Sequence, residues 1–138
     1  GGDIVMSGSP PGRSGWIIGI NVPESEKEIS GTLLSIENRS VATSGDVYQF
    51  VSLKGKKYSH IIDPRKGLGD TKQRNVTVIA SSGEQADWIA TACSLLPLRK
   101  AKRLIKNHPG TAWLISEIKR GNIKSWKSKD FNNYILRN

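Results

Sequence analysis

The chain has one cysteine and two histidines among its 138 residues, and these shortages exclude several classes of protein. Cys93 has no second cysteine for an intramolecular disulfide, and a cysteine-rich zinc site is excluded for the same reason. A lone thiol in an apolar helical pattern is typical of a small core residue. No apolar run approaches the ~20 residues that span a bilayer, and the first residues show no signal-like region.

Acidic residues are scarce in the last third of the chain. Residues 98–138 contain eleven basic and two acidic side chains, so the whole net charge of +9 lies there. Together with its aromatic residues, such a segment is able to bind nucleic acid or an anionic membrane surface. The alternative is the solvated face of an amphipathic helix followed by a basic tail. Because no signature of a nucleic-acid module accompanies the charge, we favour the solvated face and expect no nucleic-acid partner.

Short apolar and β-branched segments, separated by glycine and proline, predict a mostly antiparallel sheet. Lys54-Gly55 predicts a hairpin that leads to His60, and residues 68–75 are expected to form a charged loop. The other expected strands are residues 16–22, which we expect to be buried, 32–36, 76–80, and a closing hairpin of 111–118 and 122–126.

Two helical patterns follow the strand at 76–80. Ser81 with Glu84, or Ser82 with Gln85, has the spacing of a capping box, and the helix is expected to end before Pro97. A second helix over residues 98–107 places its apolar side chains on one face. The fold class is therefore α+β, a mostly antiparallel sheet with two adjacent helices, and its length and composition suit one domain.

Asp87 and Thr91 are four residues apart in the first expected helix, so they share one face. A carboxylate and a hydroxyl in this arrangement suit a hard cation such as Mg²⁺, which prefers oxygen ligands. The alternative is structural: Asp87 favours the first helical turn through the macrodipole, and Thr91 bonds back to the carbonyl of residue 87. Spacing alone favours this structural alternative.

The loop after the expected hairpin brings together a histidine, a carboxylate and a guanidinium. His60 is a candidate general base, because histidine titrates near neutral pH, or a strand histidine with a satisfied hydrogen bond. Arg65 suits bidentate pairing with a pyrophosphate, or else a surface ion pair. For Asp63 we favour an Asx-type hydrogen bond that caps the turn before Gly67.

The small residues Thr43-Ser44-Gly45 predict a turn whose hydroxyl and N–H groups are able to hold a phosphate, although taken alone they favour an ordinary loop. Taken together, five ordered motifs resemble the ApbE family of FAD:protein FMN transferases. The motifs are Gly1-Gly2-Asp3, Ala42-Thr43-Ser44-Gly45-Asp46, Tyr58-Ser59-His60-Ile61-Ile62-Asp63-Pro64-Arg65, Val76-Thr77-Val78-Ile79-Ala80 and Ala86-Asp87-Trp88-Ile89-Ala90-Thr91-Ala92.

The resemblance implies an enzyme that binds FAD with Mg²⁺, cleaves its pyrophosphate and attaches FMN to a threonine or serine hydroxyl of an acceptor protein. It implies Asp87 and Thr91 as metal ligands and His60 as the group that activates the acceptor hydroxyl. It further implies a nucleotide site along Thr43, Ser44, Gly45, Ile61, Asp63 and Arg65. The alternatives are an FAD-binding protein or FAD pyrophosphatase without transfer, and a basic module that binds an anionic polymer or membrane.

Two features depart from the family pattern. Lys66 stands where the family usually has threonine, and Gly-Gly-Asp normally lies near the middle of a longer domain. Residues 1–138 are therefore expected to be the C-terminal part of an ApbE-like flavin transferase domain, with 98–138 as its basic C-terminal segment and the N-terminal half as a partner. The resemblance also suggests an exported bacterial protein, periplasmic or membrane-anchored.

Overall fold

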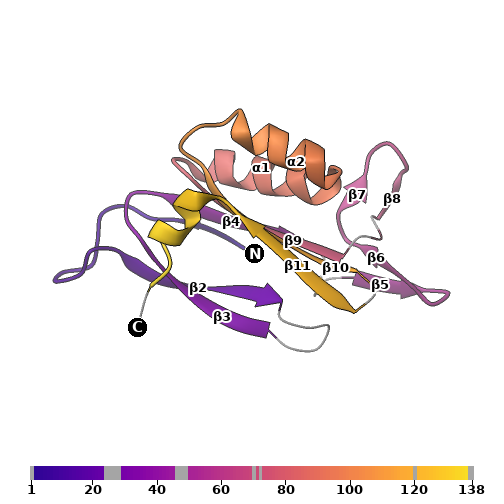
Figure 1. The fold of residues 1–138 in the computed structure, drawn as a ribbon, viewed down its shortest axis with the longest axis horizontal. Coiled ribbons are helices and arrows are strands. Elements are labelled where there is room, and N and C mark those ends of the chain that lie inside the picture. Colours follow the sequence, from indigo (N-terminus) through magenta and orange to yellow (C-terminus); the bar gives the residue numbers. More distant parts are fainter. Residues whose placement is uncertain are drawn as a thin grey trace.

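A five-stranded antiparallel sheet with the strand order β1-β4-β9-β10-β11 forms the centre of the molecule (Figure 1). The computed structural model describes residues 2–23, 29–45, 50–69, 71, 73–119 and 121–136. Gly1, Asp46 and the hairpin residue Arg120 lie outside this part of the chain. The strands of the sheet are β1 (Asp3–Val5), β4 (Ser40–Gly45), β9 (Gln73–Ala80), β10 (Ala112–Lys119) and β11 (Asn122–Lys127).

Both helices cover one face of this sheet (Figure 1). Helix α1 (Gly83–Leu95) begins after Ser82, whose hydroxyl accepts the Gln85 N–H at 3.2 Å, so Ser82 and not Ser81 is the N-cap. The Gln85 side chain accepts from the Ser81 hydroxyl instead of completing the capping box. Helix α2 (Leu98–Lys106) follows after Pro97. The core between helices and sheet consists of small and β-branched side chains: Ala42, Val76, Val78, Ala80, Ala86, Ile89, Ala90, Cys93, Ala101, Ile105 and Ile115.

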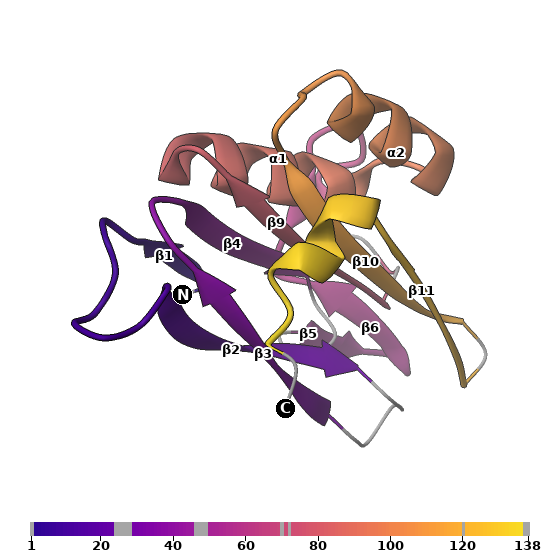
Figure 2. The ribbon, with the colours of Figure 1, turned by 60° about the vertical axis from the view of Figure 1, so that its left-hand side comes forward.

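A two-stranded ribbon lies beside the opposite face, as Figure 2 shows. It pairs β2 (Trp16–Pro23) with β3 (Ile29–Ile36) and buries Ile20, Leu34 and Ile36 against the sheet. The expectation of a buried strand over residues 16–22 is wrong, because only Ile20 of that range is buried. A ribbon of two strands packs through one face, so the alternate side chains remain exposed.

Smaller elements extend from one end of the sheet. The expected hairpin is confirmed as β5 (Phe50–Leu53) and β6 (Lys56–Ser59), joined at Lys54 and Gly55 with φ of 49° and 75°. Two positive φ values are typical of the type I′ turn, whose twist matches that of the strands. The others at this end are β7 (Ile62–Asp63) and β8 (Leu68–Gly69). A 3₁₀ turn η1 (Lys129–Asn133) follows β11 near the start of β10, where the Ser128 N–H donates to the Trp113 carbonyl oxygen. No helix in the described ranges is long and apolar enough to cross a membrane.

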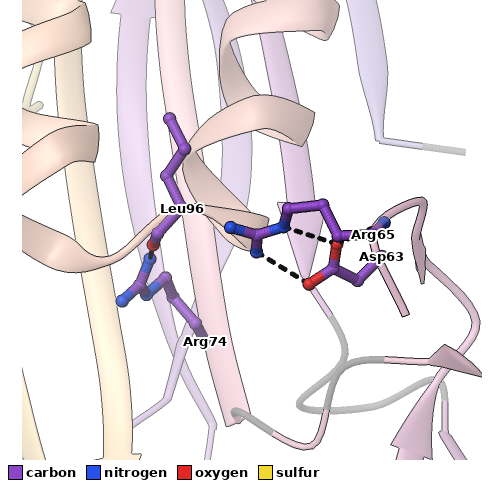
Figure 3. A network of polar contacts seen from close by, with 4 residues as sticks. All are labelled: Asp63, Arg65, Arg74 and Leu96. Atoms are coloured by element: carbon purple, nitrogen blue, oxygen red, sulfur yellow. Dashed lines mark hydrogen bonds and ion pairs between the residues drawn. The ribbon is translucent and has the colours of Figure 1, made fainter.

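Strand β9 begins three residues earlier than expected, because a buried arginine continues it. Arg74, 2% exposed, donates to the Glu117 carboxylate and to the carbonyl oxygen of Cys93. It also donates to the carbonyl oxygen of Leu96 at the end of α1 (Figure 3). These partners satisfy the charge and bind α1 to the sheet. The polar residues that predicted a loop before Val76 therefore form a strand.

Arg74→Met is expected to lower the free energy of unfolding by about 3 kcal/mol, because it leaves the Glu117 carboxylate and two helix carbonyls without their donor. Arg99→Met is the control, because Arg99 is exposed on α2 and its loss is expected to change stability by less than about 0.5 kcal/mol. Urea unfolding measures both variants, and equal small effects would show that the Arg74 contacts do not hold α1 in place.

The single cysteine is a core residue, as predicted. Cys93 lies fully buried on α1, and burial raises the pKa of its thiol to about 12. The reactive species of a cysteine is the thiolate, so this thiol is chemically inert at neutral pH.

Candidate functional site

A cavity of about 540 Å³ lies where one end of the sheet meets α1 and the β2 strand. Seven of the nine site residues predicted from the sequence line it: Thr43, Ser44, Gly45, His60, Ile61, Asp87 and Thr91. They come from β4, from the segment after β6 and from α1, so the fold brings together positions up to 48 residues apart in the sequence. The volume falls in the range of small-molecule and cofactor sites.

Three oxygen-bearing side chains form a cluster in this cavity. The Thr91 hydroxyl lies 3.5 Å from a carboxylate oxygen of Asp87 and 3.0 Å from the hydroxyl of Ser44. Asp87 and Thr91 share one face of α1, and Ser44 faces them from β4. Thr91 is therefore held between two polar side chains that the sequence separates by more than forty residues.

This cluster fits a hard divalent cation. Its donors are a carboxylate and hydroxyls, which are the ligand types that suit Mg²⁺. Among the described residues, no group of three or more His, Cys, Asp and Glu side chains is placed to hold a metal ion. Mg²⁺ usually takes one or two protein carboxylates and completes its shell with water and substrate phosphate, so the small donor set matches that ion.

His60 lies on the cavity wall directly after the β5–β6 hairpin, where it is exposed to solvent. Its neighbour Ile61 is half-buried and lines the same cavity. The tight turn at Lys54-Gly55 sets the position of the second hairpin strand and so of His60. A side chain in this position is able to reach both a bound ligand and a second substrate that arrives from solvent.

The segment Thr43-Ser44-Gly45 is the end of strand β4, so the predicted turn is wrong. Thr43 pairs with Thr77 of β9, and their hydroxyls lie 3.0 Å apart. At Gly45, with φ of 154°, an added Cβ would lie 2.3 Å from the carbonyl oxygen of Arg74. Glycine is therefore required for the close approach of β4 to β9, and the strand ends at the cavity.

Asp63 and Arg65 are not among the residues that line the cavity. The carboxylate of Asp63, only 1% exposed, accepts the backbone N–H of Arg65 at 3.0 Å, which confirms the Asx-type contact. It also accepts Nε and Nη2 of Arg65 at 2.9 and 2.7 Å (Figure 3). The hairpin of β7 and β8 thus uses both side chains to stabilise its own turn. Their contact with a nucleotide stays a prediction.

Hydrogen bonds from the Arg65 side chain lower the pKa of Asp63 well below its usual range, and the exposed Lys66 adds a smaller effect of the same sign. A carboxylate whose pKa is lower in the folded than in the unfolded state stabilises the fold. This contribution is fully present above the unfolded-state pKa, about 4, and is lost as the pH falls below it. We therefore expect the free energy of unfolding to fall more steeply below about pH 4 in the wild type than in Asp63→Asn. Urea unfolding between pH 6 and pH 3 tests this, and parallel curves would contradict it.

The sequence did not indicate the β2 wall of the cavity. This wall consists of Ile18, Gly19, Ile20 and Asn21, and the Asn75 side chain donates to the Asn21 carbonyl oxygen at 3.0 Å. That bond joins the ribbon to the start of β9. Asp3 of β1 also lines the cavity and adds a second carboxylate. The Gly-Gly-Asp motif alone was only a weak indication that this residue belongs to a site.

Comparisons with known proteins place the chain in context. A family model described as the ApbE family matches residues 1–115. The FAD:protein FMN transferase of Klebsiella pneumoniae is 29% identical over 99% of this chain and 39% of its own length. That of Buchnera aphidicola subsp. Schizaphis graminum is 32% identical over 87% of this chain and 35% of its own.

Solved structures agree with these matches. The flavin transferase ApbE from Vibrio cholerae superposes with a TM-score of 0.80 and 26% identity, covering 97% of this chain and 42% of that one. The ApbE protein from Thermotoga maritima gives a TM-score of 0.78 and 28% identity, with 99% and 43% coverage. The α+β fold expected from the sequence is thereby confirmed. This chain spans about two-fifths of the length of the curated relatives it matches.

Proposed function

Because this chain belongs to the ApbE family, we propose that it forms part of an Mg²⁺-dependent FAD:protein FMN transferase. One observation carries the proposal: a single cavity gathers His60, the Asp87–Thr91 pair and the end of β4. These are the residue types that the reaction requires, namely a base for a hydroxyl, oxygen ligands for a cation, and backbone that approaches a phosphate closely. FAD and an acceptor protein with a threonine or serine hydroxyl are the proposed substrates.

The reaction exchanges one phosphoester for another. The hydroxyl oxygen of the acceptor attacks the phosphorus on the FMN side of the pyrophosphate, and the bond from this phosphorus to the bridging oxygen breaks. AMP leaves with the bridging oxygen, and FMN remains attached to the acceptor. The imidazole of His60 accepts the proton that the hydroxyl loses.

The residues of α1 have a different task. The Asp87 carboxylate and the Thr91 hydroxyl would hold the cation, and Ser44 orients Thr91 through the 3.0 Å contact. When bound, Mg²⁺ supplies neutralisation of the phosphate charge. The end of β4 at Gly45 lines the cavity next to this cluster, where its backbone is able to face the nucleotide.

Product analysis tests the proposal and separates it from its nearest alternative. The protein, in its longest natural form, is incubated with FAD, Mg²⁺ and a threonine-bearing acceptor, and the acceptor mass and free AMP are measured. A transferase adds the mass of FMN less one water to the acceptor and releases one AMP for each addition. Release of both FMN and AMP with an unchanged acceptor would instead identify an FAD pyrophosphatase.

A further inference from the structure

Helix α2 presents a dense basic face on the surface of the molecule. Five of its nine residues are lysine or arginine and none is acidic. At 100° per residue these five side chains occupy an arc of roughly 160°, opposite the buried Ala101 and Ile105. We call them the α2 basic face: Arg99, Lys100, Lys102, Arg103 and Lys106.

These charges are not neutralised by described carboxylates. No ion pair joins a member of the α2 basic face to an acidic side chain within the described ranges. Of the two acidic residues in the C-terminal segment, Glu117 binds Arg74 and Asp130 lies on η1. Like charges so close together repel one another, and binding of an anionic partner would offset this repulsion.

The basic surface continues beyond the helix. The Lys102 ammonium lies 4.9 Å from the ring centre of Trp126 on β11, so α2 and this strand are adjacent. The exposed Lys124 lies two residues before Trp126 on the same strand, so its side chain points to the same side of the sheet. The result is a positively charged surface built from two elements rather than from one helix alone.

The shape of this surface discriminates between anionic partners. A single-stranded nucleic acid requires a groove and aromatic platforms for its bases. No member of the α2 basic face lines the functional cavity or three further cavities of the described residues, and Lys102 lies over Trp126. A convex helix side with evenly spread cations instead fits an extended, laterally mobile anionic surface.

We propose that the α2 basic face binds the anionic headgroups of a lipid bilayer. The apolar side of α2 is already buried against α1 and the sheet, so the helix adsorbs through charge and does not insert. This role is independent of the proposed flavin transfer, because no member of the face lines the functional cavity.

Vesicle binding tests the proposal with the whole protein. We expect binding to phosphatidylcholine vesicles that contain about one-third phosphatidylglycerol, none to pure phosphatidylcholine, and loss of binding as salt rises well above physiological ionic strength. Lys100→Glu with Arg103→Glu reverses two charges on the face and is expected to lower the partition coefficient at least about a hundredfold, at about fivefold for each unit of charge.

The matched control reverses two charges elsewhere. Lys54→Glu with Lys56→Glu changes the net charge equally on the exposed β5–β6 hairpin and is expected to lower partitioning less than about threefold. Equal losses for the two pairs would overturn the proposal, since total charge would then explain the binding. Absence of binding to the anionic vesicles would also overturn it, as would α2-dependent binding of DNA with no vesicle binding.

Discussion

Replacing Asp87 with asparagine is expected to lower FMN transfer by about a thousandfold or more, because it removes the only carboxylate of the oxygen cluster. The amide retains the shape of the side chain and one oxygen, but it carries no charge to offset that of the metal. The dependence of the residual rate on Mg²⁺ is expected to shift to higher concentration. Initial rates measured over a magnesium titration give both quantities.

Glu84→Gln is the matched control for this change. Glu84 is an exposed acidic residue in the first turn of the same helix and does not line the cavity. If Asp87 acted only through the helix dipole, the two variants would have similar, small effects on stability and none on transfer.

Thr91→Ser, which keeps the hydroxyl, is expected to retain far more activity than Thr91→Ala. Equal activity of these two variants would contradict a ligand role for Thr91.

His60→Gln is expected to reduce transfer by about a hundred- to ten-thousandfold while FAD still binds, because only the proton acceptor is lost. Glutamine keeps polarity and approximate size, so the wall of the cavity changes little. Transfer is measured by acceptor mass and FAD binding by flavin fluorescence. A large loss of FAD affinity would show that His60 holds the nucleotide rather than activating the acceptor.

The second histidine provides the control for His60. His108 lies away from the cavity, where its ring contacts Trp88 edge-on with ring centres 5.0 Å apart. His108→Gln is therefore expected to leave the transfer rate within about twofold of the wild type, as surface substitutions generally do. A comparable fall in both variants would indicate that general damage to the fold, and not the loss of a base, lowers the rate.

Local signals in the sequence predicted the elements that depend on local chemistry. The Lys54-Gly55 turn and the Ser82 cap each act through a few neighbouring residues, and both form as expected. Strand β9 was misjudged at its start because Arg74 is polar, and its partners come from α1 and β10. No neighbour in sequence reveals that such a charge is satisfied.

In the site, too, features that depend on neighbouring residues were predicted, and features that depend on distant residues were missed. The spacing of Asp87 and Thr91 was sufficient to place both on one face of a helix, and the fold adds Ser44 beside them. The β2 wall was missed because Ile18 and Gly19 carry no chemistry that a pattern reports. For Arg65 the sequence left a pyrophosphate contact and a surface ion pair open; the structure shows the ion pair with Asp63, and the pyrophosphate contact stays a prediction.

A crystal structure of the protein in its longest natural form, soaked with FAD and Mn²⁺ in place of Mg²⁺, tests the central claim most directly. Manganese scatters anomalously and prefers the same oxygen ligands. The account predicts a manganese peak at ligand distance from the Asp87 carboxylate and the Thr91 hydroxyl, with the FAD phosphates between that peak and His60. A manganese peak elsewhere, or FAD bound outside this cavity, would contradict the account.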